Sequence, residues 1–155
     1  MPLTIWAQGT SPDVESLPER RLRRDALRDQ GRTLHIALVN NMPDLALMAT
    51  QRQFGGVLEA AGGEFDIVLS LWTLDSVPRS ADTRRNIAGL YGAASQLRAA
   101  APDAIIITGA EPCTHNLEDE PYWRELTGLF DWSRTGTLSV LALSLIHISE
   151  PTRPY

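Results

Sequence analysis

The chain has 155 residues, of which 43% are hydrophobic, and its formal net charge is −5 at pH 7. This size and apolar content suit one globular domain with a sizeable core. The negative charge argues against a nucleic-acid-binding protein, and no apolar run reaches the ~18 residues that a membrane-spanning helix needs.

The first third of the chain changes from irregular to periodic near Gly31. Residues 1–18 have no apolar period and are expected to be irregular, and the Arg-rich stretch that follows predicts a short solvated helix ending near Gly31. Residues 1–33 therefore read as a leader. The next run, LHIALVN (34–40), is apolar and rich in β-branched residues, which is typical of a strand buried on both faces.

Strands and helices then alternate to the end of the apolar pattern. Further strands are predicted at 65–74, 103–110 and 137–143. Helical spacing and end signals predict helices at 44–63, 80–100 and 119–134. In the helix at 80–100, one face is expected to carry Ile87, Leu90, Tyr91, Ala94 and Leu97.

This alternation predicts right-handed βαβ units and a parallel sheet covered by helices. We therefore expect an α/β fold of the flavodoxin-like type, in which strand 34–40 is central and the sheet is truncated after its fourth strand. Ligands of such sheets bind beyond the carboxyl ends of the strands. The site is accordingly sought in the loops that follow the strands.

Two of these loops carry the candidate binding residues. Asn40, Asn41, Met42 and Pro43 lie between the first strand and its helix, where the amides are expected to cap the helix or to donate to a ligand. Capping is the favoured role from this segment alone.

The second loop follows the third strand and contains Thr108, Gly109, Ala110 and Glu111, where a glycine lets the backbone turn and offer N–H groups to an anion. Neither loop has the pattern of a nucleotide-binding motif.

Cys113 and His115 lie further along the second loop. A cysteine–histidine nucleophile pair or a metal site would need both side chains to converge, or further ligands nearby. Side chains two positions apart usually diverge, and the sequence has no second cluster of cysteine or histidine. We therefore interpret both as ordinary loop residues and predict neither a catalytic residue nor a metal site from the residues themselves. The single cysteine also fits a reducing cytoplasm.

Several segments in order resemble the homoserine O-acyltransferase family of methionine biosynthesis (the homoserine O-succinyltransferase type). IALVNNMPDLALMATQRQF is similar to the family's strand, Asn-x-Met-Pro loop and helix. IIITGAEP with DEPYWREL is similar to its Val-Thr-Gly-Ala-Pro loop and the Tyr-Trp helix that follows. SVPRSADTRRNIAGLY and LFDWSRTGTLSVL match the family's Ser/Arg link and the Trp-Ser segment before the nucleophile strand.

The resemblance covers about residues 34 to 142 and implies a class I glutamine-amidotransferase-like fold used for acyl transfer. In the family, a cysteine on a strand-to-helix turn takes the acyl group from succinyl-CoA or acetyl-CoA and passes it to L-homoserine. A histidine and a glutamate much further along the chain assist. The resemblance implies a cytoplasmic enzyme without a bound cofactor, leaves open which acyl-CoA is the donor, and leaves a homodimer open.

The chain departs from the family at two places. Asp44 and Leu45 follow the Met-Pro pair, where the family often has lysine. Ser144 stands where the nucleophile is expected, and LSLIHISEPTRP is the translation of the adapter used in transposon-based sequencing libraries.

We therefore expect residues 34–142 to be the N-terminal part of the α/β domain and residues 143–155 to be a non-native tail. The nucleophile, the histidine and the glutamate would lie beyond residue 142, so His147 is not catalytic and the chain itself is expected to be inactive. Two alternatives remain: a non-catalytic flavodoxin-like module that binds a small ligand, and another amidotransferase-like hydrolase.

Overall fold

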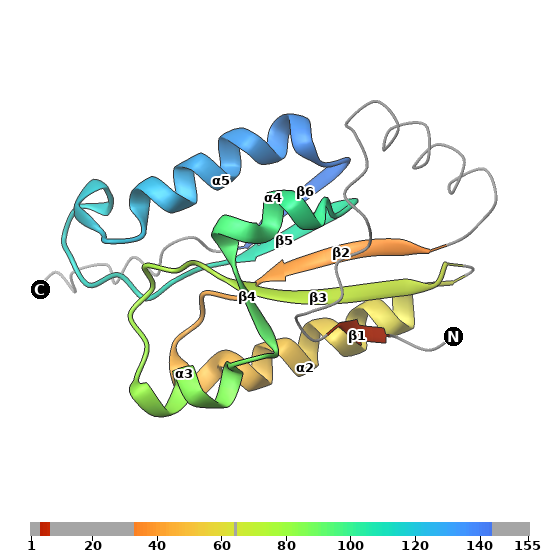
Figure 1. The fold of residues 1–155 in the computed structure, drawn as a ribbon, viewed down its shortest axis with the longest axis horizontal. Coiled ribbons are helices and arrows are strands. Elements are labelled where there is room, and N and C mark those ends of the chain that lie inside the picture. The colour runs from red at the N-terminus through yellow and green to blue at the C-terminus, as the bar shows by residue number, and fades with distance from the viewer. Residues whose placement is uncertain (1–3, 7–32, 64, 144–155) are drawn as a thin grey trace, which may run out of the picture.

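The computed structural model describes residues 4–6, 33–63 and 65–143, which form a twisted parallel sheet with helices on both faces (Figure 1). The strands are β1 (Thr4–Trp6), β2 (Leu34–Val39), β3 (Ile67–Thr73), β4 (Tyr91–Ala93), β5 (Ala104–Thr108) and β6 (Ser139–Leu143). Their order is β1-β3-β2-β5-β6, with β4 also paired to β3, and every pairing is parallel. The expected α/β class, flavodoxin-like order and central position of β2 are confirmed.

Helices cover both faces of this sheet (Figure 1). The helices are α2 (Asp44–Ala61), α3 (Ala81–Ile87), α4 (Leu97–Ala100) and α5 (Trp123–Gly136), with short 3-10 turns at η1 (Ala94–Gln96) and η2 (Leu117–Asp119). In Figure 1, α2 and α3 lie on one side of the sheet, and α4 and α5 lie on the other. No helix in the described part of the chain is both long and apolar enough to cross a membrane.

Successive strand residues alternate between two apolar layers, as the pleat of a strand requires. The layer under α4 and α5 contains Val39 of β2 and Ile107 of β5, together with Leu97, Leu126 and Leu129 of the helices. The opposite layer contains Leu38, Leu71 and Ile106, packed with Leu47 of α2 and Ile87 of α3. Because β2, β3 and β5 feed both layers, nearly every residue along them is apolar.

The predicted helix at 80–100 is wrong. Helix α3 ends at Ile87, and Gly89 follows with φ of 81°, a left-handed conformation that turns the chain. Residues Tyr91–Ala93 then form β4, parallel to the end of β3, before the short η1 and α4. The five residues expected on one helical face divide between the layers: Ile87, Leu90 and Tyr91 pack in one, and Ala94 and Leu97 in the other. Several short elements bury these residues on opposite faces of the sheet, and their spacing in the sequence happens to match the period of one helix.

The remaining boundaries shift by a few residues. Helix α5 begins at Trp123, after the acidic residues and Pro121 that were expected to open it. Helix α2 ends at Gly62-Gly63 as expected, with Gly63 at φ of 55°. Residues 4–6 form a strand within the stretch expected to be irregular. With this strand and β4, the described part of the sheet has six strands and not four. The predicted helix that ends near Gly31 lies outside the described residues. The expected tail at 143–155 does so too, except for Leu143, which ends β6.

Candidate functional site

A cavity of about 500 Å³ opens beyond the carboxyl ends of β2, β5 and β6. Six of the predicted binding residues line it, and they are Met42, Pro43, Thr108, Gly109, Ala110 and Glu111. Helix α2 contributes Thr50, Gln53 and Phe54, and β6 contributes Leu143. The cavity therefore lies at the edge of the sheet where ligands of parallel α/β folds bind.

Asn41 lies under the cavity and joins the ends of three strands. Its backbone N–H donates to Thr108 Oγ1 at 2.8 Å and its side-chain N–H to Thr108 O at 3.3 Å, so it holds the end of β5. Its side-chain oxygen accepts from the N–H of Leu74 at 3.1 Å, which fixes the chain just after β3. Asn41 is 1% exposed. Such a buried amide is costly to disturb, because each lost bond leaves a desolvated partner.

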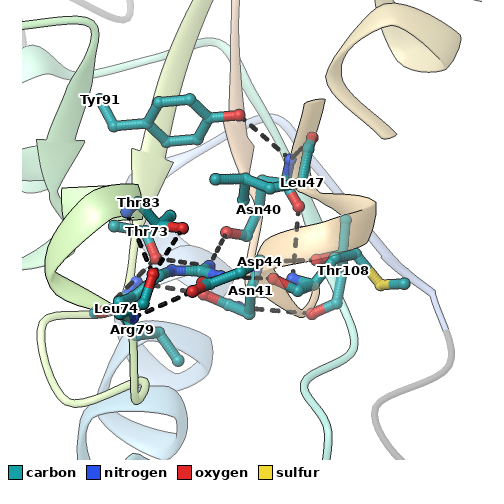
Figure 2. A network of polar contacts seen from close by, with 12 residues as sticks. Asn40, Asn41, Asp44, Leu47, Thr73, Leu74, Arg79, Thr83, Tyr91 and Thr108 are labelled. Atoms are coloured by element: carbon teal, nitrogen blue, oxygen red, sulfur yellow. Dashed lines mark hydrogen bonds and ion pairs between the residues drawn. The ribbon is translucent and has the colours of Figure 1, made fainter. Parts of the chain in front are cut away.

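Asn40 makes a second buried set of bonds on the α2 side of the sheet (Figure 2). Its side-chain nitrogen donates to Leu47 O at 2.9 Å and to Tyr91 Oη at 3.1 Å. Tyr91 in turn donates to Gln51 Oε1 of α2 at 3.1 Å. Burial raises the pKa of Tyr91, so its phenol stays protonated at neutral pH. This network ties the start of α2 to β2 and β4.

The predicted capping role of the two amides is wrong. The residue before the first turn of α2 is Pro43, and no side chain there bonds to a helix N–H. Pro43 fixes its own φ, so the helix can begin without a side-chain cap. Asn40 and Asn41 instead brace the strand ends from beneath, and neither side chain lines the cavity.

Arg79 clamps the loop that carries Met42 and Pro43. Its guanidinium donates to the carbonyl oxygens of Asn40 and Met42, to Thr73 Oγ1 at 3.2 Å, and to Asp44 Oδ1 at 3.3 Å. The side chain is 4% exposed, and its Nε has no partner in the described part of the chain. The planar guanidinium can reach several acceptors at once, which a lysine ammonium cannot do in the same geometry.

Asp44 completes this clamp at the start of α2. Partial burial opposes ionisation of its carboxyl group, but hydrogen bonds from Ser80, Thr83 and Arg79 outweigh burial and lower the pKa of Asp44 to about 2. The backbone N–H of Ser80 donates to it at 2.9 Å. An ionised carboxylate in the first turn also offsets the positive end of the helix dipole. The sequence predicts no role for Arg79 or for this pair, because their partners lie some 35 positions away.

Glu120 shapes the loop on the other side of the cavity. Its Oε1 accepts from the N–H groups of Cys113 and Thr114 at 2.7 and 2.6 Å, and from Thr114 Oγ1 at 2.9 Å. Burial alone would raise the pKa of Glu120, but these hydrogen bonds lower it below its ordinary value. Burial and the neighbouring Glu120 charge raise the pKa of Tyr122 to about 12. A buried carboxylate thus fixes the turn that follows Glu111.

Cys113 and His115 lie outside the cavity. Both residues are exposed, and the thiol contacts the carbonyl oxygen of Glu111 at 3.9 Å. Among the described residues, no group of three or more histidine, cysteine, aspartate or glutamate side chains is arranged to hold a metal ion.

Comparison with known proteins agrees with the motifs that line this cavity. Residues 14–147 match the model of the family described as homoserine O-succinyltransferase. The chain is 46% identical over 110 residues to a homoserine O-succinyltransferase of Rhodopseudomonas palustris. This alignment covers 71% of this chain and 33% of that protein. It is 35% identical over 133 residues to that of Methylococcus capsulatus, covering 86% of this chain and 36% of the relative.

A third relative, from Thiobacillus denitrificans, is 37% identical over 134 residues and is covered to 38% of its length. The chain thus spans about a third of the length of the curated relatives that it matches. Its family match includes the loops after β2 and β5 that form the cavity wall. This chain belongs to the homoserine O-succinyltransferase family.

Proposed function

We propose that this chain is part of an acyltransferase that moves an acyl group from acyl-CoA to the hydroxyl oxygen of L-homoserine. The observation that carries the proposal is the cavity beyond the carboxyl ends of β2, β5 and β6, whose walls are the segments that resemble the family. The relatives named homoserine O-succinyltransferase support succinyl-CoA as the donor. No bound cofactor is part of this proposal, and acyl-CoA takes part as a co-substrate.

In this proposal the described residues build the substrate side of the site, and the reacting groups lie beyond residue 142. A cysteine thiolate attacks the thioester carbonyl and releases CoA, and the acyl-enzyme then passes its acyl group to homoserine while a base takes the hydroxyl proton. A thiolate that follows residue 142 at the end of β6 would stand at the cavity wall, where Leu143 lies in this chain. Asn40 and Asn41 act in this scheme by holding the wall in place.

The first test is the DNA from which the sequence was read. If residues 143–155 derive from a sequencing adapter, resequencing the source DNA beyond codon 142 gives a different sequence in place of LSLIHISEPTRP. A cysteine followed by small residues, with a distal histidine and glutamate, supports the acyltransferase. A Gly-x-Cys-x-Gly turn supports an amidotransferase-like hydrolase, and the absence of a cysteine supports a binding module.

The second test is activity of the complete protein. We expect release of CoA from succinyl-CoA that depends on L-homoserine, with acetyl-CoA as the comparison donor and L-serine as the comparison acceptor. Homoserine-independent hydrolysis of glutamine, or the absence of CoA release with either donor, contradicts the proposal. The 155-residue chain serves as the control, and we expect no turnover from it.

Cys113 offers a sharper control for the location of the nucleophile. It lies after β5 and outside the cavity, so we expect no acyl adduct on it when the chain is mixed with succinyl-CoA or acetyl-CoA. Intact mass spectrometry measures this directly. A stoichiometric adduct on Cys113 would show that the reacting thiol has been misplaced.

We also propose that the complete protein acts in the cytoplasm, where acyl-CoA and homoserine meet.

A further inference from the structure

One arginine binds the backbone of a loop that forms part of the cavity wall. The carbonyl oxygens of Asn40 and Met42 lie on either side of Asn41 in the chain, and both accept from the guanidinium of Arg79. Met42 and Pro43 line the cavity, whereas Arg79 is not among the described residues that line it. Arg79 therefore acts on the cavity through the backbone of this loop.

The donors of the guanidinium match the acceptors around it. Nη1 donates to Met42 O and to Asp44 Oδ1 at 3.3 Å. Nη2 donates to Asn40 O at 3.0 Å and to Thr73 Oγ1 at 3.2 Å. Each of these nitrogens carries two N–H groups, so four donors meet four acceptors. A lysine has three N–H groups on a single nitrogen and cannot reach all four acceptors.

The ion pair of Arg79 with Asp44 also fixes two loops relative to each other. Arg79 belongs to the loop between β3 and α3 and lies 37 positions after Met42. Its side chain is 4% exposed, and Asp44 at the start of α2 is the carboxylate that pairs with it. Removing one partner of a buried ion pair leaves an uncompensated charge. We therefore expect the pair to hold the loop as a unit.

We infer that Arg79 is a positioning residue for the proposed acyl transfer and that Asp44 acts with it. The pair holds Met42 and Pro43 in the place where they contact the substrate that occupies the cavity, and it takes no part in the chemical steps. This inference rests on the proposed function. A wall residue contacts the substrate both before and during the reaction, so a displaced wall raises KM without lowering kcat.

The kinetic experiment uses the complete protein with Arg79→Lys, which keeps the positive charge and loses the contact with all four acceptors. We expect the KM for one of the two substrates to rise about fivefold or more, while kcat stays within about twofold of the wild type. Arg85→Lys is the matched control, because Arg85 lies on α3 with 73% of its side chain exposed, and it should keep both KM values. A lower kcat with both KM values unchanged indicates only a loss of folded enzyme and overturns the inference.

Asp44→Asn tests whether the pair acts as a unit, and it is the milder variant if Arg79→Lys does not fold. It removes the charge that faces Arg79, and we expect it to raise the same KM by about twofold. In the double variant the KM should stay close to that of Arg79→Lys, because the second change removes a contact that is already lost. Asp131→Asn, an exposed carboxylate on α5, is the control. Unchanged KM values in Asp44→Asn, or a double variant whose KM is the product of the two single effects, contradict the inference.

Hydrogen–deuterium exchange separates this inference from the proposed function, because it needs no turnover. We expect the amides of residues 41–47 to exchange about fivefold faster in Arg79→Lys than in the wild type, and those of β5 to keep their rates. If the complete protein releases no CoA, the acyltransferase proposal fails, and exchange alone then decides whether Arg79 positions the loop. Equal exchange of residues 41–47 in both proteins, or an active protein in which Arg79→Lys keeps both wild-type KM values, overturns the inference.

Discussion

Strands β5 and β6 have similar sequences but very different surroundings. AIIIT of β5 lies between β2 and β6, and Ile105, Ile106 and Ile107 are 0%, 6% and 0% exposed. SVLAL of β6 lies at the edge of the described sheet, and Val140, Leu141 and Leu143 are 36%, 49% and 37% exposed. An apolar strand is buried only where neighbours cover both of its faces and pair with both of its edges.

The same difference in burial distinguishes the two walls of the cavity, one formed at the ends of the central strands and the other at β6. Around β2, β3 and β5, buried polar groups such as Asn41 and Arg79 are held by bonds to several elements. At β6, Leu143 joins the same cavity wall from a strand paired on one edge only among the described residues. We therefore expect the central wall to be rigid and the β6 wall to depend on whatever packs against it. The following predictions test this contrast.

The largest effect is expected from deleting equivalent apolar groups in the two strands. Ile107→Ala opens a cavity in the buried layer and should destabilise the chain by ~2–4 kcal/mol. Leu141→Ala removes a half-exposed side chain and should cost less than ~1 kcal/mol. Urea denaturation followed by circular dichroism measures both. Similar midpoints for the two variants would show that β6 is as well covered as β5.

The next effect comes from the amide under the cavity. Asn41→Ala leaves the N–H of Leu74 and the carbonyl oxygen of Thr108 without their partner, and we expect a loss of ~2–3 kcal/mol. Asn86→Ala, on an exposed position of α3, is the matched control and should stay within ~0.5 kcal/mol of the wild type. If both variants unfold at the same urea concentration, the strand ends do not depend on Asn41.

Asp44 should make stability depend on acid pH. Its folded pKa of about 2 lies below the ordinary 3.8, so the stabilisation by its ionised form is complete above the ordinary value and is lost as the pH falls through about 2. Asp44→Asn should remove on the order of 1 kcal/mol of this pH dependence. Thermal melts from neutral pH down to about pH 2 measure it.

Asp131→Asn, an exposed carboxylate on α5, is the control for this pH series. If the melting temperature depends on pH in the same way in Asp44→Asn and in the wild type, the ionised Asp44 carboxylate does not stabilise the loop as we propose.

The smallest change in folding stability is expected at the edge itself. Leu141→Lys puts a charge on an exposed strand, which should change the unfolding free energy by less than ~1 kcal/mol but reduce self-association through the open edge. Val57→Lys, on an exposed position of α2, tests whether charge alone has this effect. Sedimentation velocity over a range of concentrations measures association. A wild-type chain that stays monomeric, or equal association in both variants, contradicts this prediction.

Local pattern predicted the strands and the long helices well, because each depends on residues close in sequence. The apolar runs near β2, β3, β5 and β6 were each found within a few residues, as were α2 and α5. The stretch at 80–100 was misread because Ile87, Tyr91, Ala94 and Leu97 are all buried but serve opposite faces of the sheet. The spacing of apolar residues indicates that they are buried, but it does not indicate which of the two apolar layers each residue joins.

The sequence by itself determined the parallel α/β sheet, the loops that carry the candidate site and the motifs that belong to the family. These follow from strand and helix periods, from short connections and from residues that lie together in the chain. The tertiary structure alone decided that Asn40 and Asn41 brace the strand ends, that Arg79 and Glu120 hold the two loops, and that Glu111 lines the cavity. The physical reason is that hydrogen bonds and ion pairs are satisfied in space, between atoms that can be tens of residues apart.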